Sequence, residues 1–138
     1  MTEDEPPFRL DRPTVDALVG HSWSDFPYEV CGLLGTDATG RIHHFPITNA
    51  ERSMTYYVMQ PKELLQAMRT IEDAGWDLAI YHSHTHTEAY PSRTDIELAA
   101  YPEATYLIVT LQDRDAPAIR AFRIEDGVVT ERPVVVAS

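Results

Sequence analysis

The chain has 138 residues, of which 43% are hydrophobic, and a formal net charge of −11 at pH 7. This length and composition predict one domain with a sizeable core and argue against disorder. The acidic balance argues against a nucleic-acid partner, because phosphate binding depends on clusters of Lys and Arg. No segment is apolar for long enough to predict a membrane span, and the acidic first residues do not resemble a signal peptide. The single cysteine, Cys31, excludes an intrachain disulfide and suits a reducing compartment, so a cytoplasmic location is expected.

The expected organisation is an acidic N-terminal tail over residues 1–10 and one folded domain over residues 11–138. Apolar periodicity and turn residues predict, in order, a helix over 12–23, strands over 30–35 and 41–47 around a hairpin loop, a strand over 55–59, a helix over 61–74 ended by Gly75, a strand leading to His84, a helix over 93–101, strands over 105–112 and 118–124, and a strand over 128–136. Hairpins with interposed helices indicate an α/β domain, with a mixed, mostly antiparallel sheet flanked by helices.

Residues 82–95 contain the most informative pattern of the chain, His-Ser-His-Thr-His-Thr-Glu-Ala-Tyr-Pro-Ser-Arg-Thr-Asp. His82 and His84 stand at the end of an apolar strand, and side chains two apart on a strand point to the same face. Ser92 and Asp95 lie three apart, on the same side of the first turn of a predicted helix. Two imidazoles and a carboxylate suit zinc, and three protein ligands leave a fourth position for water. The pattern therefore predicts a catalytic metal site.

Each part of this pattern also has a plainer interpretation. A His-x-His pair is often only a polar strand end, and Ser92 with Asp95 fits a helix capping box. The two interpretations of Ser92 are compatible, since its oxygen can cap a helix while its proton is donated elsewhere. His86 follows the same alternation, but the polar residues leading to Pro91 end the strand first, which makes His86 a loop residue. Cys31 is interpreted as a small buried hydrophobe.

The pattern resembles that of the JAMM/MPN+ zinc metallopeptidases, which is His-Ser-His, seven residues, Ser, two residues and Asp, with a glutamate well upstream. Glu29, in Pro-Tyr-Glu-Val-Cys-Gly-Leu-Leu-Gly, matches that glutamate. The similarity extends through residues 48–53, 81–95 and 106–109, and it is greatest to a small bacterial branch that releases cysteine from a sulfur-carrier protein. The resemblance implies the MPN (cytidine-deaminase-like) fold, with Zn²⁺ held by His82, His84 and Asp95, and with Glu29 and Ser92 as catalytic residues.

The resemblance also implies a substrate, a ubiquitin-like β-grasp carrier protein cut after its C-terminal Gly-Gly with release of cysteine or another small adduct. Ubiquitin-specific relatives carry insertions that clamp ubiquitin, and 138 residues leave little room for them. Two alternatives remain, a broader isopeptidase that frees such carriers from lysine, and a metal-free MPN scaffold. The scaffold is disfavoured because a protein without chemistry has no reason to keep buried polar groups that cost stability unless they are satisfied, and this chain keeps the whole set of His82, His84, Asp95, Ser92 and Glu29.

Overall fold

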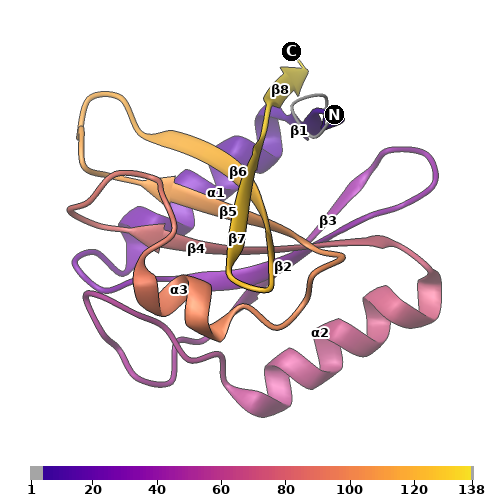
Figure 1. Cartoon of the computed structure of the whole chain (residues 1–138), viewed down its shortest axis with the longest axis horizontal. Helices are drawn as coiled ribbons and strands as arrows, with labels where there is room; N and C mark the ends of the chain where they lie inside the picture. The colour runs from indigo at the N-terminus through magenta and orange to yellow at the C-terminus, as the bar shows by residue number, and fades with distance from the viewer. Residues whose placement is uncertain (1–4, 138) are drawn as a thin grey trace.

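The computed structural model describes residues 5–137, and within them the chain forms eight strands and three helices (Figure 1). Their bounds, in order, are β1 (Phe8–Asp11), α1 (Arg12–Ser24), β2 (Cys31–Thr36), β3 (Ile42–Ile47), α2 (Pro61–Ala74), β4 (Asp77–His84), α3 (Arg93–Leu98), β5 (Thr105–Thr110), β6 (Ala118–Glu125), β7 (Val128–Arg132) and β8 (Val134–Ala137). None of the helices in residues 5–137 has both the length and the apolar character needed to cross a membrane.

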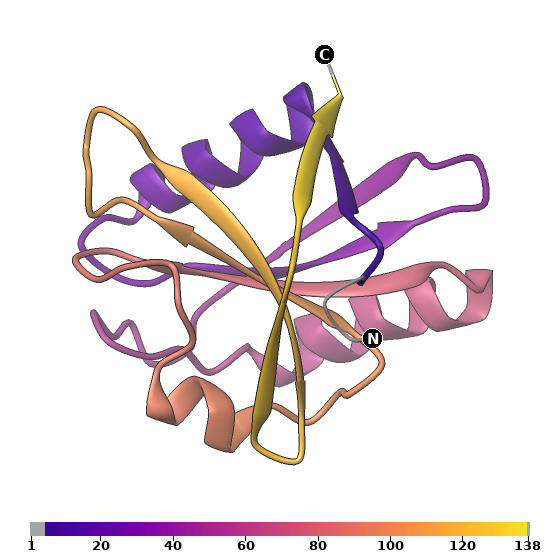
Figure 2. The ribbon, with the colours of Figure 1, turned by 45° about the horizontal axis from the view of Figure 1, so that its top comes forward.

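The described strands form a six-stranded sheet in the order β3-β2-β4-β5-β6-β7, with β1 and β8 paired separately. Only the β4–β5 pair of the large sheet is parallel, and its other pairs are antiparallel. The predicted mixed, mostly antiparallel sheet is therefore confirmed. Helix α1 covers one face of the sheet, and α2 and α3 lie on the other (Figures 1 and 2).

Local signals in the sequence explain where the helices begin and end. The side chain of Asp11 caps α1 by accepting the Thr14 N–H at 2.7 Å. In α2, the side chain of Gln60 accepts the Glu63 N–H at 2.8 Å, and Gly75 ends the helix with φ = 71°, a conformation that favours glycine. Both helices place a proline in their first turn, where its missing N–H costs nothing.

The sheet divides the core into two layers. Tyr81 and Leu107 point toward α1, whereas Ile80 and Ile108 point toward α2 and α3. Strand β4 runs through the middle, between β2 and β5, so His82 and His84 alternate with the α1-facing side chains and emerge on the α2 side. The central strand therefore carries the predicted ligands at its carboxyl end, where the sheet meets α3.

The predicted strand over residues 55–59 is wrong, because this segment is irregular and has only one bridge, between Asn49 and Met59. The side chain of Asn49 explains the difference. Its Oδ1 accepts the Val58 N–H at 3.0 Å, and its Nδ2 donates to the Tyr56 carbonyl at 3.3 Å. Backbone groups that a strand would pair with a neighbouring strand are satisfied by a side chain instead.

The chain ends also differ from expectation. Pro133 divides the predicted 128–136 strand into β7 and β8, since proline cannot donate a ladder hydrogen bond. Strand β8 leaves the large sheet and pairs in parallel with β1, a strand that the sequence did not predict. The structure thus places residues 8–10, which the sequence assigns to the acidic tail, in a paired strand with Leu10 buried. Residues 1–4 of that tail lie outside the described residues.

Helix α3 is shorter than the predicted 93–101 helix, since it ends at Leu98. The hydroxyl of Tyr106 accepts the N–H groups of Ala100 and Tyr101, each at 3.1 Å, so these donors are satisfied without a further helical turn.

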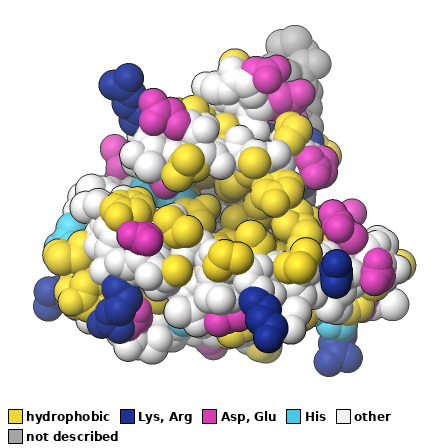
Figure 3. Space-filling model, turned by 90° about the horizontal axis from the view of Figure 1, so that it is seen from below, with side chains coloured by type: hydrophobic (Ala, Val, Ile, Leu, Met, Phe, Trp, Pro, Cys, Tyr) yellow, Lys and Arg dark blue, Asp and Glu magenta, His cyan; other side chains and the backbone are white. Residues whose placement is uncertain are grey.

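The α2 side of the molecule carries an apolar hollow. Figure 3 views the molecule from below and shows hydrophobic side chains gathered around a depression. Partly buried apolar residues of the 49–59 segment, α2, α3 and β7 pack over this side of the core, among them Tyr57, Met59, Leu64, Ile96 and Val129.

Candidate active site

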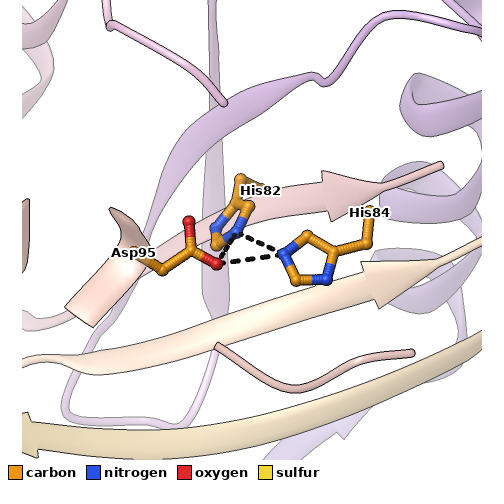
Figure 4. A group of neighbouring side chains, drawn as sticks. All are labelled: His82, His84 and Asp95. Atoms are coloured by element: carbon orange, nitrogen blue, oxygen red, sulfur yellow. Dashed lines mark hydrogen bonds and ion pairs between the residues drawn. The ribbon is translucent and has the colours of Figure 1, made fainter. Parts of the chain in front are cut away.

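The structure brings the three predicted metal ligands together. His82 Nε2 lies 3.1 Å and His84 Nε2 lies 3.0 Å from Asp95 Oδ2, and the two nitrogen atoms are 3.2 Å apart (Figure 4). The histidine side chains are 2% and 4% exposed and that of Asp95 is 7% exposed. Strand β4 and the first turn of α3 thus converge on one buried point, and these three residues form a group able to hold a metal ion.

The hydrogen bonds around His84 show what kind of ligand fits this point. His84 Nδ1 lies 2.7 Å from the Glu88 carbonyl, which can only accept, so Nδ1 carries a proton. In the neutral ring, Nε2 then presents a lone pair toward the Asp95 carboxylate, another acceptor. Two acceptors 3.0 Å apart need either a proton or a metal cation between them. Ligands of a tetrahedral zinc, with bonds of about 2.0–2.1 Å, lie about 3.3 Å apart, so the donor set and its spacing fit zinc.

The pKa shifts of these groups have the same cause. Burial alone would raise the pKa of Asp95, but its bonds to His82 and His84 outweigh burial and hold the pKa far below its ordinary value. Burial lowers the pKa of His82. Burial also acts to lower the pKa of His84, yet Asp95 and the Glu88 carbonyl raise it on balance. The site therefore favours positive charge beside His84 and Asp95, so a metal ion bound there would displace a proton.

Glu29 lies just before β2 and is 3% exposed. Its Oε1 is buried and has no hydrogen-bond partner among the residues that the structure describes. Burial raises the pKa of Glu29 to about 8, with His84 partly offsetting the rise and Asp95 adding to it. A carboxyl group with a pKa near neutrality, whose protonation responds to the charges of His84 and Asp95, can both accept and donate a proton.

Ser92 caps α3 in the predicted capping box. Its Oγ accepts the Asp95 N–H at 3.0 Å, and the Ser92 N–H donates to Asp95 Oδ2 at 2.8 Å. The hydroxyl proton is not used in this exchange, because Oγ acts there as an acceptor. Ser92 can therefore donate a hydrogen bond while it caps the helix.

We expect Ser92→Ala to slow turnover while metal content stays unchanged, because the ligands remain in place. Losing a donor to the developing oxyanion costs about 10²–10³ in rate, and losing the cap costs about 1 kcal/mol of stability. Steady-state kinetics and thermal unfolding separate the two effects. A variant with reduced stability and full activity would limit Ser92 to capping.

His86 and Cys31 lie outside the ligand group. Strand β4 ends at His84 as predicted, and the exposed His86 packs against Phe26, with ring centroids 5.4 Å apart. Cys31 is fully buried, lies 3.4 Å from the Ile47 carbonyl, and has its pKa raised to about 12 by burial. The interpretation of Cys31 as a small buried hydrophobe is confirmed.

Sequence reasoning missed three residues next to the site. The ring of Tyr57 stacks on His82, with centroids 4.7 Å apart. Asn49 and Ser83 form buried hydrogen bonds to the Glu29 carbonyl and the Val30 N–H, the two polar groups of the peptide that follows the Glu29 side chain. The available signal was weak. Ser83 is a polar residue between two predicted ligands on a buried strand, and Asn49 precedes a segment that has the residue types of a strand.

Comparison with known proteins supports the family resemblance that the motif indicates. The family model for prokaryotic homologs of the JAB domain matches residues 11–125. The chain is 49% identical to the CysO-cysteine peptidase of Mycobacterium tuberculosis over 87% of this chain and 84% of that protein. It is 35% identical to a desampylase of Haloferax volcanii over 72% of this chain and 77% of that protein.

A solved structure supports the fold. A Desulfitobacterium hafniense protein determined in solution is similar with a TM-score of 0.80 and 30% identity, over 94% of this chain and 92% of that one. With the match over residues 11–125, the resemblance inferred from the motif is confirmed. The chain belongs to the prokaryotic branch of the JAB domain family.

Proposed function

We propose that this protein is a zinc peptidase that cleaves after the C-terminal Gly-Gly of a ubiquitin-like carrier protein and releases cysteine or another small adduct. One observation carries the proposal. His82, His84 and Asp95 direct three atoms to one buried point, and the buried Glu29, whose pKa is raised to about 8 by burial, interacts electrostatically with His84 and Asp95. Metal-assisted amide hydrolysis needs these two parts, a set of metal ligands and a group that transfers a proton.

Zinc, when bound by His82, His84 and Asp95, supplies a Lewis acid that polarises the scissile carbonyl and makes a water molecule acidic. Glu29 takes a proton from the attacking water at its carboxylate and delivers it to the leaving amine as the C–N bond breaks. The carrier leaves with a C-terminal carboxylate. Ser92 Oγ–H donates to the oxygen that becomes negative, and the Asp95 N–H holds Oγ in place.

A protein substrate is supported by the surface near Glu29. Met54, Tyr56 and Val58, in the segment hydrogen-bonded to Glu29, are 47%, 37% and 41% exposed. Apolar groups exposed together beside a site are typical of protein-binding surfaces. The identity with a CysO-cysteine peptidase favours a carrier that bears a C-terminal cysteine.

The proposal is tested with a carrier protein ending in Gly-Gly-Cys, incubated with the zinc-loaded enzyme and followed by intact mass spectrometry. We expect loss of the cysteine mass and a product ending in Gly-Gly. A matched carrier with Val in place of the last glycine should react far more slowly, because we propose that the tail binds as an extended strand in a channel too narrow for the valine side chain. Equal rates for the two carriers would remove the physical basis for a Gly-Gly substrate.

The similarity to a desampylase motivates a second candidate, cleavage of an isopeptide bond between a carrier and a lysine side chain. The same incubation with a carrier joined to a lysine ε-amine distinguishes the two. A kcat/KM for the lysine conjugate equal to or above that for the cysteine adduct would favour the broader isopeptidase.

A further inference from the structure

Glu29 is held in the site through its backbone rather than through its carboxyl group. Among the residues that the structure describes, Oε1 of its carboxyl group is buried without a hydrogen-bond partner. The backbone N–H of Glu29 donates to the Ser53 carbonyl at 2.8 Å. The direction of this side chain therefore depends on how firmly the main chain is fixed immediately before β2.

Ser83 fixes the Glu29–Val30 peptide through the N–H group of that peptide. Ser83 lies between His82 and His84 on β4, so its side chain points to the opposite face of the strand. It is fully buried, and its Oγ accepts the Val30 N–H at 2.9 Å, while its own N–H donates to the Val30 carbonyl at 3.0 Å. The Ser83 hydroxyl thus accepts the Val30 N–H, which would otherwise donate to a β4 carbonyl at the point where the chain enters β2.

Asn49 fixes the same peptide through its carbonyl group. Its side-chain Nδ2 donates to the Glu29 carbonyl at 3.0 Å, and its Oδ1 accepts the Val58 N–H at 3.0 Å. Asn49 is 6% exposed. The same 49–59 segment also contributes Tyr57, which stacks on the ligand His82. One hydrogen-bonded unit therefore contacts both the backbone of Glu29 and a metal ligand.

We propose that Asn49 and Ser83 are positioning residues, whose side chains hold the backbone around Glu29 and thereby fix its carboxyl group relative to His82, His84 and Asp95. The inference rests on the proposed function, because it assigns these residues a role in the proton transfer by Glu29. A proton carrier without its own hydrogen-bond anchor is sensitive to small shifts, and a displacement of about 1 Å can cost about 10²-fold in rate.

The kinetic test uses Ser83→Ala and Asn49→Asp, each alone and combined with Glu29→Gln. Asn49→Asp keeps an acceptor for the Val58 N–H but loses the donor to the Glu29 carbonyl. Each single variant should lower kcat by about 10–10²-fold with KM and zinc content nearly unchanged. In the Glu29→Gln background neither should lower kcat further, because the group they position no longer transfers protons. The same loss of rate in both backgrounds would overturn the proposal.

Ser22→Ala is the matched control. Ser22 is as fully buried as Ser83, and its hydroxyl donates to the Leu18 carbonyl within α1 at 2.8 Å, away from Glu29. The Ser22→Ala variant should keep the wild-type kcat even where its thermal stability is lower. If Ser22→Ala lowered kcat as much as Ser83→Ala, general destabilisation would explain both and the positioning role would be rejected.

A second measurement does not depend on activity. In the zinc-free protein, amide hydrogen exchange followed by NMR should accelerate for Glu29 and Val30 in both variants, while the amides of Ile80 and Leu107 in the central strands stay protected. Equal acceleration throughout the sheet would overturn the inference. If the wild-type enzyme cleaves no carrier conjugate, the proposed function fails, and this exchange result still decides whether Asn49 and Ser83 hold Glu29.

Discussion

Asp95→Ala should lose zinc and with it all measurable turnover. Asp95 Oδ2 lies at hydrogen-bond distance from both His82 and His84, so removing it leaves two imidazoles and no negative charge to hold a divalent cation. The same oxygen accepts the Ser92 N–H, so α3 should also lose about 1 kcal/mol of capping. Metal content after gel filtration, measured by mass spectrometry, and activity with a carrier ending in Gly-Gly-Cys check both effects.

Two variants control this experiment. Asp95→Asn keeps an oxygen for the Ser92 N–H and should preserve α3 while still binding zinc poorly, which separates capping from ligation. His86→Ala should retain zinc, because His86 is exposed and packs on Phe26 outside the ligand group. Full zinc content in Asp95→Ala together with zinc loss in His86→Ala would overturn the ligand assignment.

Glu29→Gln should retain zinc and lose at least about 10²-fold, and as much as 10⁴-fold, in kcat, the range that general acid–base catalysis contributes. The amide keeps the shape of the carboxyl group but cannot carry a proton from water to the leaving amine. Because the ligands are untouched, KM should change little. Near-normal kcat in a zinc-loaded Glu29→Gln protein would mean that another group carries the proton.

The pH dependence of stability in the zinc-free protein gives an independent check on Glu29. Burial raises its pKa from 4.5 to about 8, so the folded state favours the protonated carboxyl group. The stability from this preference is complete below pH 4.5 and is lost as the pH rises through 8. Gln does not titrate, so Glu29→Gln should become progressively more stable than the wild type over this range. Urea unfolding at pH 5 and pH 8.5 measures the difference, and an equal difference at the two values would contradict a raised pKa.

The ligands were predictable because local rules place them. An aliphatic run identifies β4, and two-residue alternation sends His82 and His84 to one face. Three-residue spacing at a helix start brings Ser92 and Asp95 together, and the observed capping box follows from that spacing. The contact between these two groups depended on the family resemblance, since nothing local dictates that α3 returns to the end of β4.

The parts that sequence reasoning missed depend on distant partners. Residues 55–59 have the residue types of a strand, but Asn49 takes over their backbone hydrogen bonds. Strand β1 has only four residues and pairs with Val134–Ala137, so no local sequence pattern indicates it. The bond from the Val30 N–H to Ser83 joins residues 53 positions apart. Propensity describes a segment alone, and these features arise only when two segments meet.

The parallel pairing of β1 with β8 has a consequence for protein synthesis. Leu10 is 2% exposed and belongs to the core layer under α1, but its strand is held by Val134–Ala137, which follow every other described strand along the chain. A nascent chain that has completed β2, β4 and β5 still lacks the partner of its first strand. The end of the sheet that carries His82 and His84 can therefore form before the α1 layer is closed, and synthesis of β8 closes that layer. Deleting residues 134–137 should leave a less stable protein, and an unchanged unfolding temperature would contradict this order.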